Sequence, residues 1–300
     1  MNWDDARYFL AVAREGQMLG AARRLGVSQA LLSRHMAALE HSVGTRLMDR
    51  TTKGCALTEA GQAFLEVAER VEAEMLGAAA LLRGAASAPS GTIRIGAPDG
   101  LGSAFLAPRL GALRELYPDL QIQLVPLTRS FSLSQREADL AVMVGRPVKG
   151  RLRVRRLTDY TLGLYASEIY LRRAGAPETS ADLARHSKIG YVDDLVHTTE
   201  LQYASEFLGD WHSDIEIATS IGQLEAVRAG AGIGVVHDFM ARRYETLIRV
   251  LPNMSARRTY WIVWHENMRA VQRVKAVVAF LESIVREAKA DFVIDQHTNV

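Results

Sequence analysis

The stretch Gly26–Glu40, GVSQALLSRHMAALE, has the two-sided pattern of a short amphipathic helix. Leu32, Met36 and Leu39 recur at the spacing of one helical face, which predicts a side buried in a core. Ser28 precedes the first turn, where its hydroxyl can accept a hydrogen bond from a free backbone N–H. The opposite face is polar and rich in hydrogen-bond donors, and it carries Gln29, Ala30, Ser33 and Arg34.

The residues just upstream predict a second, shorter helix that meets this one at a tight turn. Ala21, Ala22 and Leu25 would line its inner face, and Gly26 stands where the turn needs a positive φ. Two short helices that cross steeply at such a turn are typical of a helix-turn-helix, whose second helix enters the DNA major groove. An ordinary helical hairpin in a protein core is the alternative for this stretch alone.

The flanking segments favour DNA binding over the hairpin. Upstream, residues 3–16 read WDDARYFLAVAREG, with apolar side chains at helical spacing. Downstream, residues 45–61 read TRLMDRTTKGCALTEAG, which predicts a small β-wing. Its tip would carry Arg50, Thr52 and Lys53, whose cations and hydroxyls can contact phosphates. Residues 1–58 are therefore predicted to form a winged helix-turn-helix.

Five segments in fixed order make this region resemble the LysR-type transcriptional regulators: DARYFLAVAREG, AARRLGVSQ, LSRHMAALE, GTRLMDR and LTEAG. The resemblance implies a regulator that binds double-stranded DNA at a partly palindromic site. The sequence departs from the family pattern at Gln17, Met18 and Leu19, which leave the first helix of the motif without a hydroxyl cap. Leu31 stands where a small or polar residue is common, and it could contact a thymine methyl group or pack internally. The expected DNA contacts are Gln29, Ala30, Leu31, Ser33, Arg34, Arg50, Thr52 and Lys53.

Composition and charge agree with a multidomain protein of this kind. The chain has 300 residues, of which 48% are hydrophobic, enough for two or three domains with cores of their own. Net charge is only +2, but residues 1–58 hold eight basic and five acidic side chains. We expect a cytoplasmic protein, because the sequence shows no membrane span or signal peptide and the single Cys55 cannot form an internal disulfide. Cys55 is expected to fill space in the wing, with a redox role as the alternative.

A long helix is expected over residues 59–86, followed by a hinge at 87–91, SAPSG. The helix contains no proline, and its apolar positions step alternately by four and three residues, as in a coiled-coil seam. A dimerising rod is therefore predicted, with a helix packed on its own domain as the alternative. The predicted seam consists of Phe64, Ala68, Val71, Met75, Ala78 and Leu82.

After the hinge, apolar strand candidates alternate with helical stretches, which predicts an α/β fold. The LysR resemblance extends here through GTIRIGAP, LAPRLGALRELYPDLQIQL, READLAV, LGLYAS and TSIGQLEAVRAGAGIGVV. It implies an effector-binding domain, residues 92–300, built like a periplasmic solute-binding protein from two lobes. Lobe one is expected at about 92–160 and 268–290, and lobe two at about 161–264. The chain should cross between the lobes near Asp159–Leu162 and His265–Met268.

Loops at the carboxyl ends of strands are the expected effector site, because open α/β sheets bind ligands there. Helix starts in these loops can attract anions, although serine and threonine at such positions are often only caps. Asp99 leaves the charge of the effector open, since a carboxylate facing the cleft would repel an anion. His237 could equally be structural. The expected ligand-binding residues are Asp99, Gly100, Leu101, Gly102, Ser103, Thr128, Arg129, Ser130, Thr219, Ser220 and His237.

These features favour a transcriptional regulator controlled by a small molecule bound between two lobes. It would act as a homodimer or a dimer of dimers, and we expect no cofactor and no metal. An enzyme is the first alternative, but the sequence contains none of the common hydrolase, zinc-protease or phosphate-loop motifs. A transport protein is disfavoured by the DNA-binding module. A further alternative is a second half that binds protein partners, without a small ligand.

Overall fold

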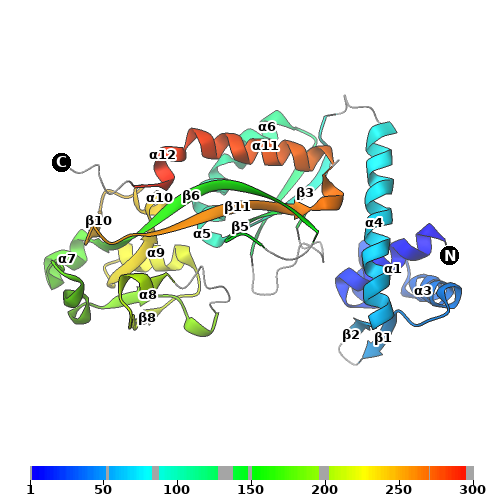
Figure 1. The fold of residues 1–300 in the computed structure, drawn as a ribbon, viewed down its shortest axis with the longest axis horizontal. Helices are drawn as coiled ribbons and strands as arrows, with labels where there is room; N and C mark the ends of the chain where they lie inside the picture. Colours follow the sequence, from blue (N-terminus) through cyan, green and yellow to red (C-terminus); the bar gives the residue numbers. More distant parts are fainter. Residues whose placement is uncertain are drawn as a thin grey trace. The chain divides into compact units, whose positions relative to one another are not determined.

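The structure is a computed structural model, and it describes residues 2–51, 54–82, 88–127, 138–147, 151–195, 203–269 and 271–294. The chain divides into two compact units, which are each described by themselves (Figure 1). Unit 1 holds the residues up to Ser87, and unit 2 holds most of those from Ala88 onward. Within the described ranges, no helix is long and apolar enough to cross a membrane.

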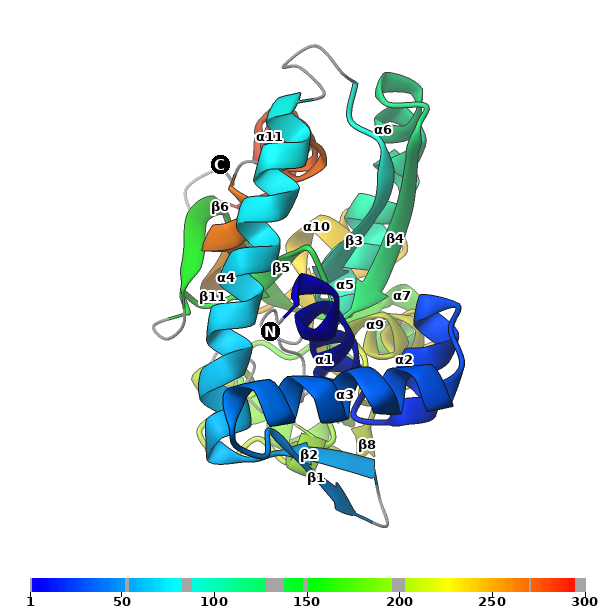
Figure 2. The same ribbon diagram turned by 90° about the vertical axis from the view of Figure 1, so that its right-hand side faces the viewer.

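Unit 1 is a three-helix module with a β-hairpin and a long following helix (Figure 2). Ser28 caps the third helix as predicted, because its Oγ accepts from the N–H of Leu31 at 3.2 Å. Gly26 has a φ of 67°, which confirms the left-handed turn. The elements are α1 (Trp3–Glu15), α2 (Met18–Leu25), α3 (Gln29–Val43), β1 (Met48–Thr51), β2 (Gly54–Leu57) and α4 (Glu59–Leu82).

The predicted apolar face of α3 is the centre of the unit 1 core. Leu32, Met36 and Leu39 are all buried. They pack in one cluster with buried residues of α1 and α2, so the amphipathic prediction for this helix is confirmed. Phe9 of α1 adds an edge-to-face ring contact with Phe64 of α4, with ring centroids 5.0 Å apart.

The seam prediction for α4 is wrong at its first two positions. Phe64 and Ala68 pack against the core of unit 1 instead of lying on an outer seam. A helix that docks on its own unit must turn one face inward, and Arg14 of α1 fixes that face by an ion pair with Glu72 at 2.6 Å. Val71 remains exposed, whereas the side chains of Ala78 and Leu82 lie outside the described part.

Unit 2 contains a nine-stranded mixed sheet with helices packed on it (Figure 1). The strand order is β4-β3-β5-β11-β6-β9-β7-β8, and β10 pairs with β6 beside this path. The strands are β3 (Gly91–Ala97), β4 (Leu120–Pro126), β5 (Leu140–Val144), β6 (Leu152–Ser167), β7 (Lys188–Gly190), β8 (Ile215–Glu216), β9 (Ile233–His237), β10 (Leu247–Val250) and β11 (Ala256–His265).

The helices of unit 2 are mostly short. A π turn and a 3-10 turn precede α6, and Pro108 lacks the N–H that a continuous α-helix needs. The helices are α5 (Asp99–Leu101), η1 (Gly102–Leu106), η2 (Ala107–Arg109), α6 (Leu110–Leu116), α7 (Glu168–Ala174), η3 (Ser180–Arg185), η4 (Asp193–Leu195), α8 (Ala204–Phe207), α9 (Ser220–Arg228), α10 (Asp238–Ala241), α11 (Gln272–Glu287) and α12 (Lys289–Phe292). The short helix η6 (Glu266–Met268) belongs to unit 1.

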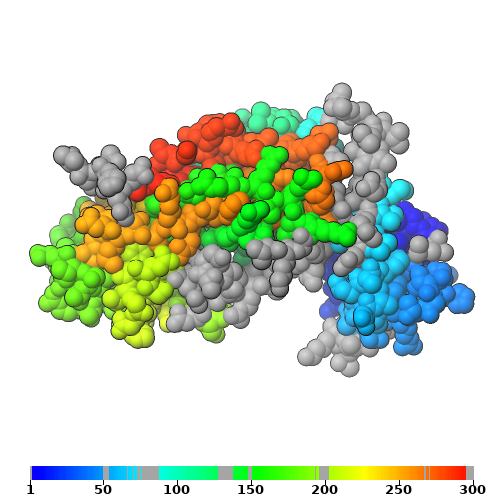
Figure 3. Space-filling model, viewed as in Figure 1, coloured from blue at the N-terminus to red at the C-terminus, as the bar shows by residue number. Residues whose placement is uncertain are grey.

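Two long antiparallel strands, β6 and β11, connect the lobes of unit 2. Figure 3 shows their side chains, green and orange, beneath the red α11. β6 pairs with β11 from Leu152 to Leu162, and its last part also pairs with β9 and β10. The second crossing lies earlier than His265–Met268, because Tyr260–Trp264 of β11 already pair with β5 of lobe one. The pairing of β11 with β6 is interrupted by a β-bulge between Tyr260 and Trp261.

Candidate functional site

The face of α3 opposite its buried stripe is open to solvent. Gln29, Ala30 and Arg34 are exposed, while Leu31 and Ser33 are half-buried. The five residues predicted to contact DNA from this helix therefore lie outside the core.

Two polar contacts fix α3 within unit 1. His35 Nδ1 lies 2.7 Å from Asp5 Oδ1 of α1. Nearer the C-terminal end of the helix, Glu40 Oε1 accepts from the backbone N–H groups of Leu47 and Met48, at 2.8 and 3.1 Å. These contacts tie the exposed face of α3 to α1 and to the start of the wing.

The predicted wing is present as the antiparallel hairpin β1–β2. Arg50 stands opposite Cys55 in its register, and the backbone N–H of Cys55 donates to the carbonyl of Gly16 at 2.7 Å. Cys55 itself is half-buried and packs against the unit 1 core, as a space-filling residue does. Thr52 and Lys53, like the side chain of Arg50, lie outside the described residues.

In unit 2, Asp99 of lobe one contacts a helix of lobe two. Its carboxylate Oδ2 accepts from the backbone N–H of Ile221, 3.1 Å away in the first turn of α9. Thr219 caps the same helix, since its Oγ1 accepts from the N–H of Gly222 at 3.1 Å. Asp99 therefore binds the positive end of the dipole of α9.

Close packing around Gly100 continues this contact between the lobes. A Cβ at this position would lie 3.0 Å from Met240 Sδ and 3.2 Å from Ser220 Cβ, both in lobe two. Glycine is thus the residue that allows the lobes to approach this closely. The hydroxyl of Ser220 in turn shares a hydrogen bond with the hydroxyl of Tyr191.

An aromatic cluster lies around the crossing strands. The Tyr160 ring stacks on Tyr260 and His237, with centroid distances of 4.0 and 5.3 Å. Burial lowers the pKa of His237 to about 4, so its imidazole is neutral near pH 7. Burial and the nearby charge of Asp99 raise the pKa of Tyr191 to about 12, so this phenol keeps its proton. The cluster is therefore uncharged.

A cavity of about 460 Å³ lies in lobe two beside this cluster, and a volume of this size suits a small molecule. Its polar groups include the indole N–H of Trp211, which donates to Ser213 Oγ at 3.1 Å, and the amide of Gln223. The lining residues are Ile189, Gly190, Tyr191, Tyr203, Ala204, Ser205, Gly209, Asp210, Trp211, His212, Ser213, Gln223 and Val235.

The predicted effector residues have different surroundings. Asp99, Gly100 and Ser220 meet between the lobes, and His237 lies in the aromatic cluster next to them. Leu101 and Gly102 are buried, Ser103 is exposed on the π turn, and Thr219 serves as a cap. Thr128, Arg129 and Ser130 lie outside the described residues.

The cavity itself is lined by residues that the sequence analysis did not select. Tyr191, Tyr203 and Trp211 come from irregular segments around short elements. Among these lining residues, Gln223 lies in the segment TSIGQLEAVRAGAGIGVV that carries the family resemblance, but it was not among the predicted ligand-binding residues. In the ranges that the structure describes, no three His, Cys, Asp or Glu side chains are grouped so that they could hold a metal ion.

Comparison with known protein families matches both units. Residues 3–62 match the family model described as bacterial regulatory helix-turn-helix protein, lysR family, and residues 86–285 match the LysR substrate binding domain. The chain belongs to the LysR family of transcriptional regulators. It is a DNA-binding regulator with an effector-binding domain, which confirms the family resemblance and the predicted fold class.

Named relatives of this LysR-family chain are also regulators. An HTH-type transcriptional regulator of Xanthomonas campestris is 33% identical over 247 residues, which cover 80% of this chain and 72% of that protein. Two solved structures share the fold. CrgA of Neisseria meningitidis covers 94% of this chain and 98% of its own, at 24% identity and a TM-score of 0.61. A full-length OxyR variant from Pseudomonas aeruginosa covers 95% and 98%, at 18% identity and a TM-score of 0.72.

The buried state of His237 predicts a pH-dependent stability. Its pKa is about 4 in the folded LysR-family chain and about 6.5 when unfolded, so the unfolded chain binds the proton more readily. The stabilising contribution is present above pH 6.5 and is lost as the pH falls toward 4. From pH 6.5 to 5, we expect the free energy of unfolding of unit 2 to fall by about 1.5 kcal/mol through this group.

The measurement is urea unfolding followed by tryptophan fluorescence in a Trp3→Phe background, which confines the signal to unit 2. His237→Gln should remove this part of the pH dependence. His186→Gln should remove a separate part of the pH dependence, since burial also lowers the pKa of His186, which lies outside the aromatic cluster. If the free energy of unfolding changed equally with pH in the parent and in His237→Gln, the assignment of this pH dependence to His237 would be contradicted.

Proposed function

We propose that α3 reads base edges in the major groove while the hairpin β1–β2 contacts phosphates. The observation that carries this proposal is the exposed face of α3, which lies directly opposite the buried Leu32, Met36 and Leu39. Residues 1–58 then form the DNA-binding domain. Its proposed contacts are Gln29, Ala30, Leu31, Ser33 and Arg34 on the helix, and Arg50, Thr52 and Lys53 on the wing.

We further propose that α4 joins two copies of the chain, with residues 59–86 as the linker helix and 87–91 as the hinge. Val67, Val71 and Met75 follow one another at four-residue spacing on this helix and are 44%, 44% and 53% exposed. Apolar side chains aligned along one side of a helix are stabilised when a partner helix covers them. A symmetric pair would place two copies of α3 on the half-sites of a partly palindromic DNA site.

For the effector, we propose the 460 Å³ cavity of lobe two together with the contact of Asp99, Gly100 and Ser220 beside it. Tyr191 supports this choice, because it lines the cavity and also hydrogen-bonds to Ser220 at the lobe contact. A molecule in the cavity can therefore act on lobe closure through one shared side chain. Leu101, Gly102, Ser103, Thr128, Arg129, Ser130, Thr219 and His237 remain proposed as surrounding positions.

The compartment in which this regulator acts is inferred from its DNA partner. A protein that binds chromosomal DNA works in the same compartment, so we propose that this regulator acts in the cytoplasm of a bacterial cell. Its effector-binding domain is proposed to bind a small molecule without turning it over, in line with relatives named as transcriptional regulators. The alternative is an effector-binding domain that recognises a protein partner instead of a small molecule. The effector experiment below distinguishes the two.

The DNA-reading proposal is tested by variants of the two faces of α3. Arg34→Ala and Gln29→Ala should each cost about 1–3 kcal/mol of specific DNA binding and leave the fold intact. Leu32→Ala is the contrast on the buried face, and it should lower the free energy of unfolding by about 2–5 kcal/mol. Fluorescence anisotropy with a mapped operator and thermal unfolding are the two measurements. An operator affinity equal to that of the wild type in both polar variants would contradict the proposal.

The pairing of α4 is tested by placing a charge on its exposed apolar side. Val71→Asp should dissociate the dimer, because two carboxylates would face each other in a desolvated seam. DNA binding to paired half-sites should weaken as well, because the second contact is no longer intramolecular. Leu116→Asp is the matched control, an apolar-to-acid change at an exposed position of unit 2. An unchanged dimer of Val71→Asp in sedimentation equilibrium would place the interface elsewhere.

The effector proposal is tested by a metabolite library in thermal-shift assays of the full chain. Trp211→Leu and Tyr191→Phe should weaken binding of a hit, the first by about tenfold because it removes a large aromatic wall. Basal operator affinity should persist. Trp261→Leu, a change of the same type outside the cavity, serves as the control. A library without hits would favour a protein partner. A hit that binds both variants with the affinity of the parent chain would place the effector site elsewhere.

A further inference from the structure

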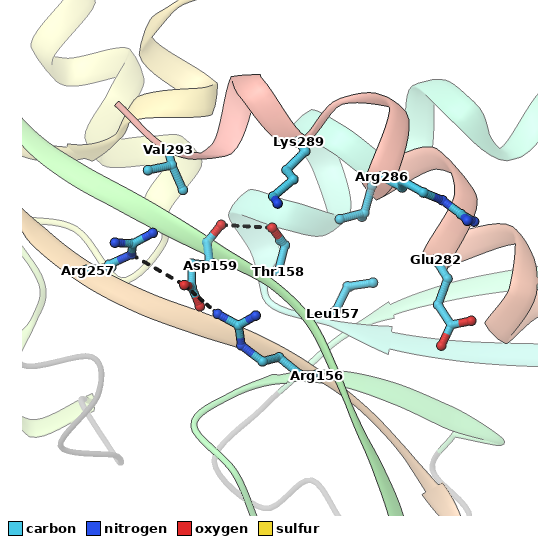
Figure 4. Close-up of a pocket in the computed structure, with 10 residues that line it drawn as sticks. Arg156, Leu157, Thr158, Asp159, Arg257, Glu282, Arg286, Lys289 and Val293 are labelled. Carbon is cyan, nitrogen blue, oxygen red and sulfur yellow. Dashed lines mark hydrogen bonds and ion pairs between the residues drawn. The ribbon is translucent and has the colours of Figure 1, made fainter. Parts of the chain in front are cut away.

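A second cavity, of about 330 Å³, lies over the strands that connect the lobes. β6 and β11 form its floor, and the C-terminal half of α11 with α12 forms its roof (Figure 4). Among the described residues it shares no lining residue with the 460 Å³ cavity. Its lining consists of Arg156, Leu157, Thr158, Asp159, Arg257, Glu282, Val285, Arg286, Lys289 and Val293.

Cations from separate segments meet at this cavity. Arg156 comes from β6, Arg257 from β11 and Lys289 from the start of α12. Figure 4 shows Lys289 extending from the helix toward the strand, while the two arginines flank Asp159. Arg286 also lines the cavity, but Figure 4 shows its guanidinium directed away from Lys289 and Asp159. In the part of the chain that the structure describes, neither Lys289 nor Arg286 has an ion-pair partner.

The two acids of the cavity are already engaged. Asp159 lies 2.5 Å from Arg156 and 3.4 Å from Arg257, and it also accepts from the hydroxyl of Thr259 at 2.7 Å. Glu282 is paired with Arg155, outside the cavity, at 3.0 Å. Asp159 therefore acts as an internal counter-ion, and the cations still exceed the acids around this space.

We propose that this cavity is a binding site for a small molecule that carries a doubly charged phosphate group. Guanidinium groups match phosphate oxygens in paired hydrogen bonds, and an ammonium supplies a further charge. A ligand must compete with Asp159 for Arg156 and Arg257. A ligand with one carboxylate carries the same charge as Asp159, so it would have no electrostatic advantage over it. A phosphate dianion exceeds Asp159 in charge, and the ammonium of Lys289 supplies a further cation for it.

The position of this site links its occupancy to the lobes. A bound phosphate would join α12 to β6 and β11 at the segment where the chain passes from one lobe to the other. If lobe closure shifts these strands relative to α12, the two lobe arrangements bind the anion with different affinity. Anion and effector would then influence each other's binding reciprocally, although neither site needs the other in order to exist.

The test uses pyrophosphate as the probe and isothermal titration calorimetry of the full chain at low ionic strength. Lys289→Gln and Arg257→Gln should each weaken binding by about fivefold, as expected for loss of one partly exposed charged contact. Asp159→Asn should strengthen binding by about fivefold, because it removes the competing anion and keeps an acceptor for Thr259. Damage to the fold alone would not raise the affinity.

Lys275→Gln is the matched control, since Lys275 is exposed on α11 but does not line the cavity. It should leave the affinity within about twofold of the parent, and added salt should weaken binding in all variants. Absence of pyrophosphate binding by the parent chain would overturn the proposal. An equal loss of affinity in Lys289→Gln and Lys275→Gln would also overturn it, because the anion would then respond to the overall charge of the protein.

Discussion

The antiparallel pairing of β6 with β11 is the interaction on which the arrangement of unit 2 depends. Its register runs from Leu152 opposite His265 to Leu162 opposite Ala256, and the strands of both lobes attach to it. Because successive side chains of a strand point to opposite faces, Tyr160 joins the aromatic cluster while Asp159 lines the 330 Å³ cavity. Two adjacent residues thus belong to two different sites, and a shift of these strands would change both.

The hydrogen bond of Asp99 with α9 is a polar contact between the two lobes. A carboxylate that accepts from a helix N-terminus gains from the helix dipole, and this gain exists only while the lobes are together. Ser220 and Tyr191 extend the contact to the wall of the 460 Å³ cavity. The sequence alone could not reveal this role of Asp99, because its partner Ile221 is 122 residues away in the chain.

Local chemistry determined which parts of the structure were predictable. The Ser28 cap, the turn at Gly26 and the buried face of α3 follow from neighbouring residues, and all three were confirmed. The docking of Phe64 and the position of the second crossing depend on long-range pairing, so the apolar spacing could not reveal them. The cavity walls were missed for the same reason, since Tyr203 and Trp211 stand in irregular segments without a periodic pattern.

Regulation by a small molecule requires that its binding energy differ between two arrangements of the lobes, and a tenfold preference corresponds to about 1.4 kcal/mol. One hydrogen bond to a charged group, such as that of Asp99 with Ile221, is worth about 1.5–3 kcal/mol when it is broken. Gain or loss of this single contact is therefore large enough to reverse which arrangement dominates. A ligand beside Tyr191 can reach this contact through the hydrogen bond between Tyr191 and Ser220, which stands in the first turn of α9.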